Sequence, residues 1–279
     1  MSEAVRVRRT LVLEPGRAER HYWADLWHYR ELFWMLAWRD IAVRYKQAAI
    51  GVLWAVVRPL LTTAIFTFVF GRIAHLSSNG APYPVFVFAG MLPWFLMSTI
   101  LAEASNSLVV NAPLVGKIYF PRMIIPSAAA VVALVDFLIN LVILFVMMLL
   151  FGVEWRWSLL ALPAFVVLAV LATLGPALLL TALNVKYRDF RYIVPFIVQF
   201  GLYISPVGFS SGVVPQKWRL LYSLNPAVGV IDGFRWAILG GPNPLYLPGF
   251  WAGLIVVCLF LWLGIRYFQK TEKTFADLI

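Results

Sequence analysis

The chain contains about six apolar runs that are long enough to cross a lipid bilayer. A transmembrane helix needs roughly 20 apolar residues to span about 30 Å of hydrocarbon. Because 62% of the residues are hydrophobic and only 13% are charged, too little polar surface remains to cover a soluble domain. The sequence therefore predicts an all-α integral membrane protein with six transmembrane helices, at residues 52–73, 85–110, 122–150, 158–183, 192–210 and 248–267.

Basic residues are distributed unevenly between these runs. A net charge of +10 would suggest nucleic acid as the partner of a soluble protein, but here the cations follow the alternation of the spans, which argues against that partner. The positive-inside rule places both termini and the basic connections in the cytoplasm. The cations flanking the spans on that side are Arg39, Arg44, Lys46, Lys117, Arg122, Lys186, Arg188, Arg191, Arg266, Lys270 and Lys273.

Several kinds of chemistry lack the residues they require. The nearest approach to a phosphate-binding loop, Gly116-Lys117, has no glycine five residues before Gly116 and no hydroxyl after Lys117. The single cysteine, Cys258, excludes an internal disulfide, and the three histidines are too scattered to converge on a metal. The first 50 residues show no secretory signal peptide. We expect no catalytic residue, metal or cofactor in this chain.

The N-terminal region divides into a cytoplasmic tail, residues 1–21, and an amphipathic interface helix, residues 22–50. On a helix of 3.6 residues per turn, Trp23, Trp27, Trp34 and Trp38 share one stripe beside basic residues, as in a helix lying on the cytoplasmic membrane surface. Leu32 and Leu36 fall on another face, which predicts a kink or a protein neighbour. An ordinary core helix is the alternative. Residues 51–279 form the six-helix transmembrane domain.

Two connections are too apolar to be plain loops. Residues 111–122 read NAPLVGKIYFPR, which suits either a short helix packed on a cytoplasmic partner or a turn on the membrane surface. Residues 211–247 contain an apolar stretch at 227–240 that would rise only about 21 Å as a helix. It is too short to span, so we predict a re-entrant pair of short helices on the periplasmic side, lining a conduit or buried in protein.

Two carboxylates fall inside predicted spans, where charge is costly. Glu103 lies beside serine and asparagine residues, and Asp136 is one turn from Asn140. Proton coupling and interhelical polar contacts both explain such residues. We favour the contacts, because no Lys or His lies at a matching depth.

Aromatic residues are abundant at span ends and within the fifth span. Their rings can stack on the apolar faces of sugars, although membrane-interface belts and core packing are commoner uses. The candidate channel aromatics are Trp94, Phe95, Phe196, Phe200, Tyr203 and Phe209.

Five motifs together give the chain a family resemblance. They are RDIAVRYKQ at residues 39–47 with GVLW at 51–54, FAGMLPW at 88–94, KIYFPR at 117–122, LNVKYRD at 183–189 and LNP at 224–226. The chain closely resembles the membrane (permease) subunits of ABC-2 type polysaccharide exporters, which move O-antigen, capsule or teichoic-acid chains.

The resemblance implies a homodimer in the bacterial inner membrane, with two separate ABC ATPase subunits that bind ATP and Mg. It implies that Lys117, Ile118, Tyr119, Phe120, Pro121 and Arg122 couple to those subunits. It further implies a cytoplasmic gate at residues 184–191 and re-entrant helices that cap the periplasmic exit.

A lipid-pyrophosphate-linked polysaccharide is then the expected cargo. Its headgroup would be attracted by Arg44, Lys46, Arg58, Arg188 or Arg191, although positive-inside orientation also explains cations at residues 186–191. An ABC-2 exporter of drugs or lipids is the first alternative. A membrane-embedded glycosyl or lipid transferase is another, but no convergent carboxylates or histidines support it.

Overall fold

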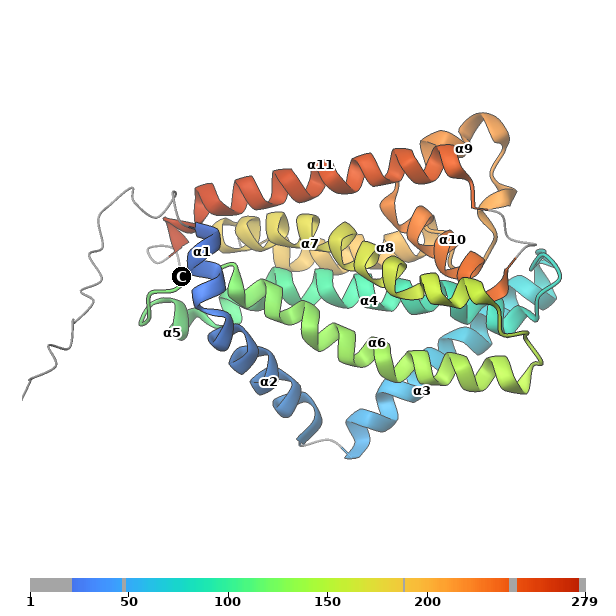
Figure 1. Ribbon diagram of the computed structural model, residues 1–279, viewed down its shortest axis with the longest axis horizontal. Helices are drawn as coiled ribbons and strands as arrows, with labels where there is room; N and C mark the ends of the chain where they lie inside the picture. The colour runs from blue at the N-terminus through green and yellow to red at the C-terminus, as the bar shows by residue number, and fades with distance from the viewer. Residues whose placement is uncertain (1–21, 47–48, 188, 241–244, 276–279) are drawn as a thin grey trace, which may run out of the picture.

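The computed structural model describes residues 22–46, 49–187, 189–240 and 245–275, and all regular structure in these ranges is helical. Four long helices lie side by side along the long axis (Figure 1). They are α4 (Tyr83–Val110), α6 (Ile124–Leu150), α7 (Leu162–Lys186) and α11 (Leu247–Glu272). Of these, α4 is central, because its first half is almost entirely buried against α6, α7 and α10.

The short elements gather at the two ends of this bundle. Figure 1 shows α1 (Tyr22–His28), α5 (Ala112–Val115) and the end of α11 at one end. At the other end lie α9 (Gln216–Tyr222) and α10 (Pro226–Leu239). The remaining short helices are η3 (Trp157–Ala161) and η4 (Ser211–Val213). Since α5 and the end of α11 belong to predicted cytoplasmic segments, the α1–α5 end corresponds to the predicted cytoplasmic side.

Two further helices form a V beside the bundle (Figure 1). The first, α2 (Arg30–Lys46), runs obliquely from the α1–α5 end, and α3 (Ala49–Phe66) continues towards the other end into the π-helix η2 (Thr67–Ile73). The predicted helix over residues 22–50 is two helices, α1 and α2, separated at Tyr29; α2 ends at Lys46, residues 47–48 lie outside the described residues, and residues 49–50 belong to α3. Backbone hydrogen bonds from Tyr29 N–H to the Asp25 carbonyl and from Phe33 N–H to the Tyr29 carbonyl bridge the break.

Five helical segments are long and apolar enough to cross a membrane, among the residues that the structure describes. They are Ala55–Ile73, Tyr83–Val110, Ile124–Leu150, Trp157–Lys186 and Leu247–Glu272, which confirms five of the six predicted spans.

The run at 192–210 is not one continuous helix, so that prediction was wrong in its second part. The helix α8 (Phe190–Ile204) has 15 residues and would rise about 22 Å. It ends because Pro206 disfavours a helical conformation at Ser205, whose ψ of 152° is extended. Residues 205–208 are nonetheless buried, so this irregular backbone lies inside the protein.

Close contact between α7 and α11 depends on two glycines. A Cβ at Gly264 would lie 2.1 Å from the Gly175 carbonyl oxygen, and one at Gly175 would lie 2.5 Å from the Leu261 backbone nitrogen. The two backbones touch without intervening side chains, as in small-residue crossings of membrane helices. Hence α7 and α11 pack as one unit.

We expect Gly264→Ala to destabilise the protein by about 1–3 kcal/mol, because the added methyl group must separate α7 from α11. The measurement is the Tm of the detergent-purified protein. Gly229→Ala in α10 is the control, because its Cβ would meet nothing closer than 3.5 Å. An equal Tm for both variants would show that the crossing tolerates separation.

Candidate functional site

The tryptophan stripe of the N-terminal helices faces away from the bundle. Trp23, Trp27, Trp34 and Trp38 are 61–71% exposed. The opposite face, with Leu36 and Ala37, is buried against the core at the α1–α5 end, in a cluster that also holds Phe120 and Phe268. The predicted protein neighbour of Leu36 is therefore the bundle itself.

Both intramembrane carboxylates bind one arginine from α2. Arg44 forms an ion pair with Glu103 of α4, and its Nη1 lies 3.0 Å from Asp136 Oδ2 of α6. The Tyr45 hydroxyl also donates to Asp136, and Asn140 Nδ2 donates to the Asp136 carbonyl at 2.8 Å. Interhelical polar contacts are confirmed, but their cation comes from the segment that we predicted to lie on the membrane surface.

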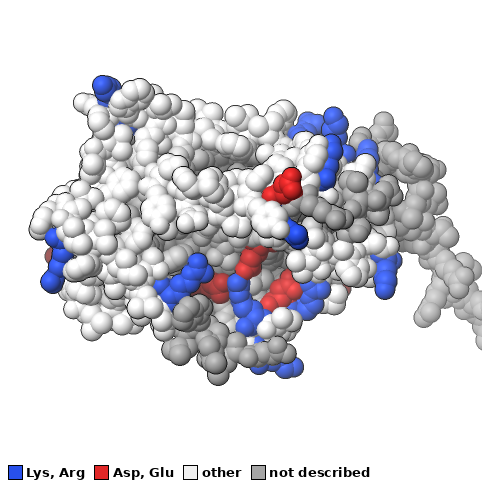
Figure 2. Space-filling view, turned by 180° about the vertical axis from the view of Figure 1, so that it is seen from behind, with Lys and Arg blue, Asp and Glu red and all other residues white. Residues whose placement is uncertain are grey.

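This cluster lies inside the bundle rather than at its end. Glu103 precedes the last residue of α4, Val110, by seven residues, and Asp136 follows the first residue of α6 by twelve. These separations correspond to about 10 Å and about 18 Å along the helices. Figure 2 shows acidic and basic side chains interleaved in one zone of a largely uncharged face.

The five candidate headgroup cations have different surroundings. Lys46, Arg58 and Arg191 are exposed, whereas Arg44 is neutralised by its carboxylates. Arg191 stacks over the Tyr192 ring at 5.2 Å, close to the start of α8. Arg188 lies outside the described residues.

The candidate channel aromatics divide into two groups. Trp94 is only 9% exposed and packs on α8, where a Cβ at Gly201 would lie 2.5 Å from its ring. Phe95 and Phe209 are half-buried, and Phe209 follows the end of α8. These three rings belong largely to the packing within the subunit.

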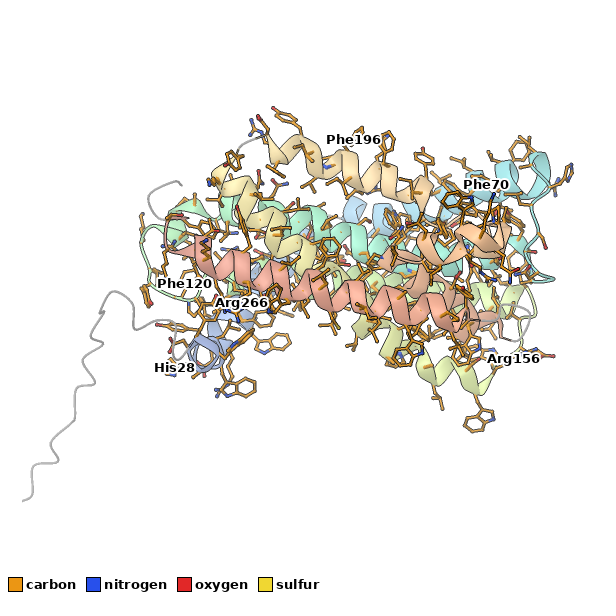
Figure 3. The ribbon with its side chains drawn as sticks, turned by 90° about the horizontal axis from the view of Figure 1, so that it is seen from above. His28, Phe70, Phe120, Arg156, Phe196 and Arg266 are labelled. Atoms are coloured by element: carbon orange, nitrogen blue, oxygen red, sulfur yellow. The ribbon has the colours of Figure 1, made fainter. Side chains whose placement is uncertain are left out.

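The other three aromatics form an exposed stripe along α8. Phe196, Phe200 and Tyr203 are 50–62% exposed, and the first two rings stack with centroids 4.2 Å apart. Figure 3 shows Phe196 on the outer side of α8, away from the other helices. This face is available to line a path or to meet lipid or a second subunit.

The predicted coupling segment has an exposed part, residues 117–119, and an anchor, residues 120–122, that packs on the bundle. Lys117, Ile118 and Tyr119 are exposed, whereas Phe120 is 3% exposed and Pro121 is buried. Ile118 and Tyr119 are thus held outward at the α1–α5 end of the bundle.

The anchor is tied to the end of α11 and to α1. The Arg122 backbone N–H donates to the Glu272 carboxylate, and its guanidinium donates to the Glu272 carbonyl. The Tyr22 hydroxyl donates to Glu272 Oε2 at 2.8 Å. Burial and this carboxylate raise the pKa of Tyr22 far above its usual range, so the phenol remains a donor.

One charged residue at the opposite end was not singled out from the sequence. Arg235 of α10 is 2% exposed, stacks on Phe86 at 3.7 Å, and donates to the carbonyls of Phe86, Val207 and Phe209. Arg235 donates hydrogen bonds to carbonyls of the irregular backbone after α8. The sequence feature that could have identified Arg235 is its position as a cation in a short apolar helix.

The described part of the chain contains no group of three or more His, Cys, Asp or Glu side chains placed to hold a metal ion.

Comparisons with known proteins agree on one family. The model of the ABC-2 type transporter family matches residues 31–239. The chain is 26% identical over 247 residues to the O-antigen export system permease protein RfbA of Klebsiella pneumoniae, covering 86% of this chain and 92% of that protein. The protein of the same name from Myxococcus xanthus is 25% identical over 257 residues, covering 91% and 98%. The polysialic acid transport protein KpsM of Escherichia coli is 24% identical over 207 residues, covering 73% and 79%.

We expect Arg44→Gln to destabilise the protein by about 1–3 kcal/mol, because two intramembrane carboxylates lose their cation. This is less than for a fully buried pair, since about a third of the Arg44 and Glu103 side chains is exposed. Combining Arg44→Gln with Glu103→Gln and Asp136→Asn should restore most of the Tm of the purified protein. A triple variant no more stable than the single one would contradict charge pairing as the cause.

Proposed function

The chain belongs to the ABC-2 type transporter family, and on that basis we propose that it is the channel-forming membrane subunit of an ATP-driven exporter of lipid-linked polysaccharide. The observation that carries the cargo assignment is the similarity to two O-antigen export permeases over nearly their whole length. A polysialic acid transport protein is similar over a shorter range. All three relatives are named for polysaccharide export or transport, so the chain is a transport subunit rather than a catalyst.

ATP and Mg are bound by two separate ABC ATPase subunits in this proposal. Ile118 and Tyr119 support a docking surface for these subunits, because both side chains are exposed and lie in the connection between two predicted spans. Because the neighbouring Phe120 is buried in the core, a force applied to Ile118 and Tyr119 is transmitted to the helices that pack around Phe120.

The membrane arrangement is a homodimer of six-span subunits in the bacterial inner membrane, with both termini cytoplasmic. The sixth span in this proposal is α8 together with the buried residues 205–208. The exposed tryptophans of α1 and α2 support contact with the membrane interface. The two short helices α9 and α10 support the re-entrant periplasmic element.

The lipid-pyrophosphate headgroup is attracted by exposed cations, one of which belongs to the proposed cytoplasmic gate at residues 184–191. Lys46, Arg58 and Arg191 fit this role, and Arg188 belongs to the same set by sequence. Arg44 does not need to contact the headgroup, because its charge is already balanced. The sugar chain passes along the aromatic stripe of Phe196, Phe200 and Tyr203, whose rings allow stacking without fixed hydrogen bonds.

Neutralising Arg58→Gln and Arg191→Gln together should weaken uptake of lipid-pyrophosphate-linked glycan about tenfold or more, since each cation near a membrane surface contributes about 1 kcal/mol. The measurement is the glycan concentration for half-maximal export by the subunit and its partner ATPase in sealed vesicles. Lys217→Gln, an exposed cation of α9, is the control. Unchanged export by a well-expressed double variant would refute the role of these two arginines in binding the headgroup. ATPase activity that responds to drugs and ignores the glycan would favour the drug-exporter alternative.

Ile118→Asp with Tyr119→Asp should weaken association with the partner ATPase about 30-fold or more, because charges replace the apolar centre of the docking surface. Co-purification and ATPase activity measure this effect. Leu220→Asp places a charge on an exposed apolar residue of α9 and should leave the association intact. Equal recovery of the ATPase with both variants would exclude this edge as the contact.

A further inference from the structure

The N-terminal arm, residues 22–46, is one helical path from the coupling segment to the interior carboxylates. It consists of α1 and α2, whose backbone hydrogen bonds continue past Tyr29. Its 25 residues correspond to about 37 Å of helix. A helix of this length, packed along one face, resists bending more than a loop does.

The first residue of the arm is bound beside the coupling segment. Tyr22 donates to the same Glu272 carboxylate that accepts from the backbone of Arg122. The coupling segment, the end of α11 and the start of the arm thus meet at one side chain. A displacement of Arg122 moves all three.

The last turn of the arm is bound inside the bundle. Arg44 holds carboxylates on two different helices, Glu103 on α4 and Asp136 on α6, and Tyr45 adds a second contact to Asp136. Shifting Arg44 along the arm therefore pulls on α4 and α6 together. Leu36 and Ala37 bury the middle of the arm against the bundle, which keeps it in line.

We propose that this arm is a strut that transmits movement of the coupling segment to α4 and α6, with Tyr22, Glu272 and Arg44 as its positioning residues. The proposal rests on the proposed function, because the coupling segment must be moved by a partner ATPase. It goes beyond that function because it gives a role in transmitting movement to residues outside the coupling segment and the channel. Arg39, which donates to Asn111 at 2.8 Å, adds a lateral tie between the arm and the end of α4.

Tyr22→Phe tests the cytoplasmic end with the smallest possible change, since it removes one hydroxyl and keeps the ring. We expect the amount of glycan exported per ATP hydrolysed to fall about fivefold, with association of the ATPase unchanged. Tyr29→Phe is the matched control, because Tyr29 lies on the same arm and its ring packs on His28. A merely structural role would lower protein yield or Tm without changing this ratio, and that result would overturn the proposal.

Arg44→Lys tests the other end, because an ammonium group cannot hold two carboxylates as a guanidinium does. If the arm acts as one strut, the double variant of Tyr22→Phe and Arg44→Lys should lose no more coupling than the more affected single variant. Independent local contacts so far apart would instead give multiplied losses, which would overturn the proposal. Should Arg44→Lys fail to accumulate, Tyr45→Phe removes the second contact to Asp136 and takes its place.

A readout without cargo separates this proposal from the proposed function. Spin labels at Val142→Cys in α6 and Val167→Cys in α7, both exposed, would report the distance between a helix that the arm holds and one that it does not, in a Cys258→Ser background. ATP bound to the full complex should change this distance, and Tyr22→Phe should reduce the change. A distance change without glycan export would support the strut and refute the cargo. Normal export together with an unaltered distance change in Tyr22→Phe would refute the strut and leave the cargo standing.

Discussion

Polar groups inside a bilayer must find their partners within the protein, because hydrocarbon offers none. Two arginines meet this requirement at different levels of the bundle. Arg44 forms ion pairs with Glu103 and Asp136 between α2, α4 and α6. Arg235 donates to the carbonyls of Val207 and Phe209, where the chain leaves helical geometry after α8, and to the Phe86 carbonyl of α4. Each arginine therefore joins segments that apolar packing alone would leave free to slide.

The two levels differ in how freely they can change. The Arg235 side chain is buried and donates to backbone carbonyls, so it holds α10 and the end of α8 in one arrangement. The Arg44 contacts are partly exposed and involve side chains on separate helices. A cluster of that kind can shift without exposing backbone to hydrocarbon. Helix movement is therefore easier at the Arg44 cluster than around α10.

Packing adds a second constraint on movement. The backbone contact of Gly175 with Gly264 binds α7 to α11, and Asn184 of α7 donates to the Ser105 carbonyl and to Asn106 of α4. The bundle therefore behaves as a connected set, with the coupling segment attached to it through Phe120 and Glu272. In our proposal the ATPase subunits act on this connected set rather than on one isolated helix.

The predictions from sequence succeeded where a local pattern carries the information. Five spans, the short apolar helix at 226–239 and the outward tryptophans follow from the length and spacing of apolar residues. The prediction failed at residues 205–210, where hydrophobicity continues but Pro206 ends the helix. A hydropathy pattern measures whether a segment can be buried, and not whether its backbone stays helical.

The sequence by itself determined the membrane class, most of the helices and the family, because these depend on residues near one another in the chain. Only the tertiary structure decided which charges pair. Arg44 lies 59 residues from Glu103 in the chain, and Tyr45 lies 91 residues from Asp136. Nothing in the spacing of these residues brings them together. Their contact arises because α2 crosses the bundle obliquely, and that angle is set by packing between helices rather than by any one segment.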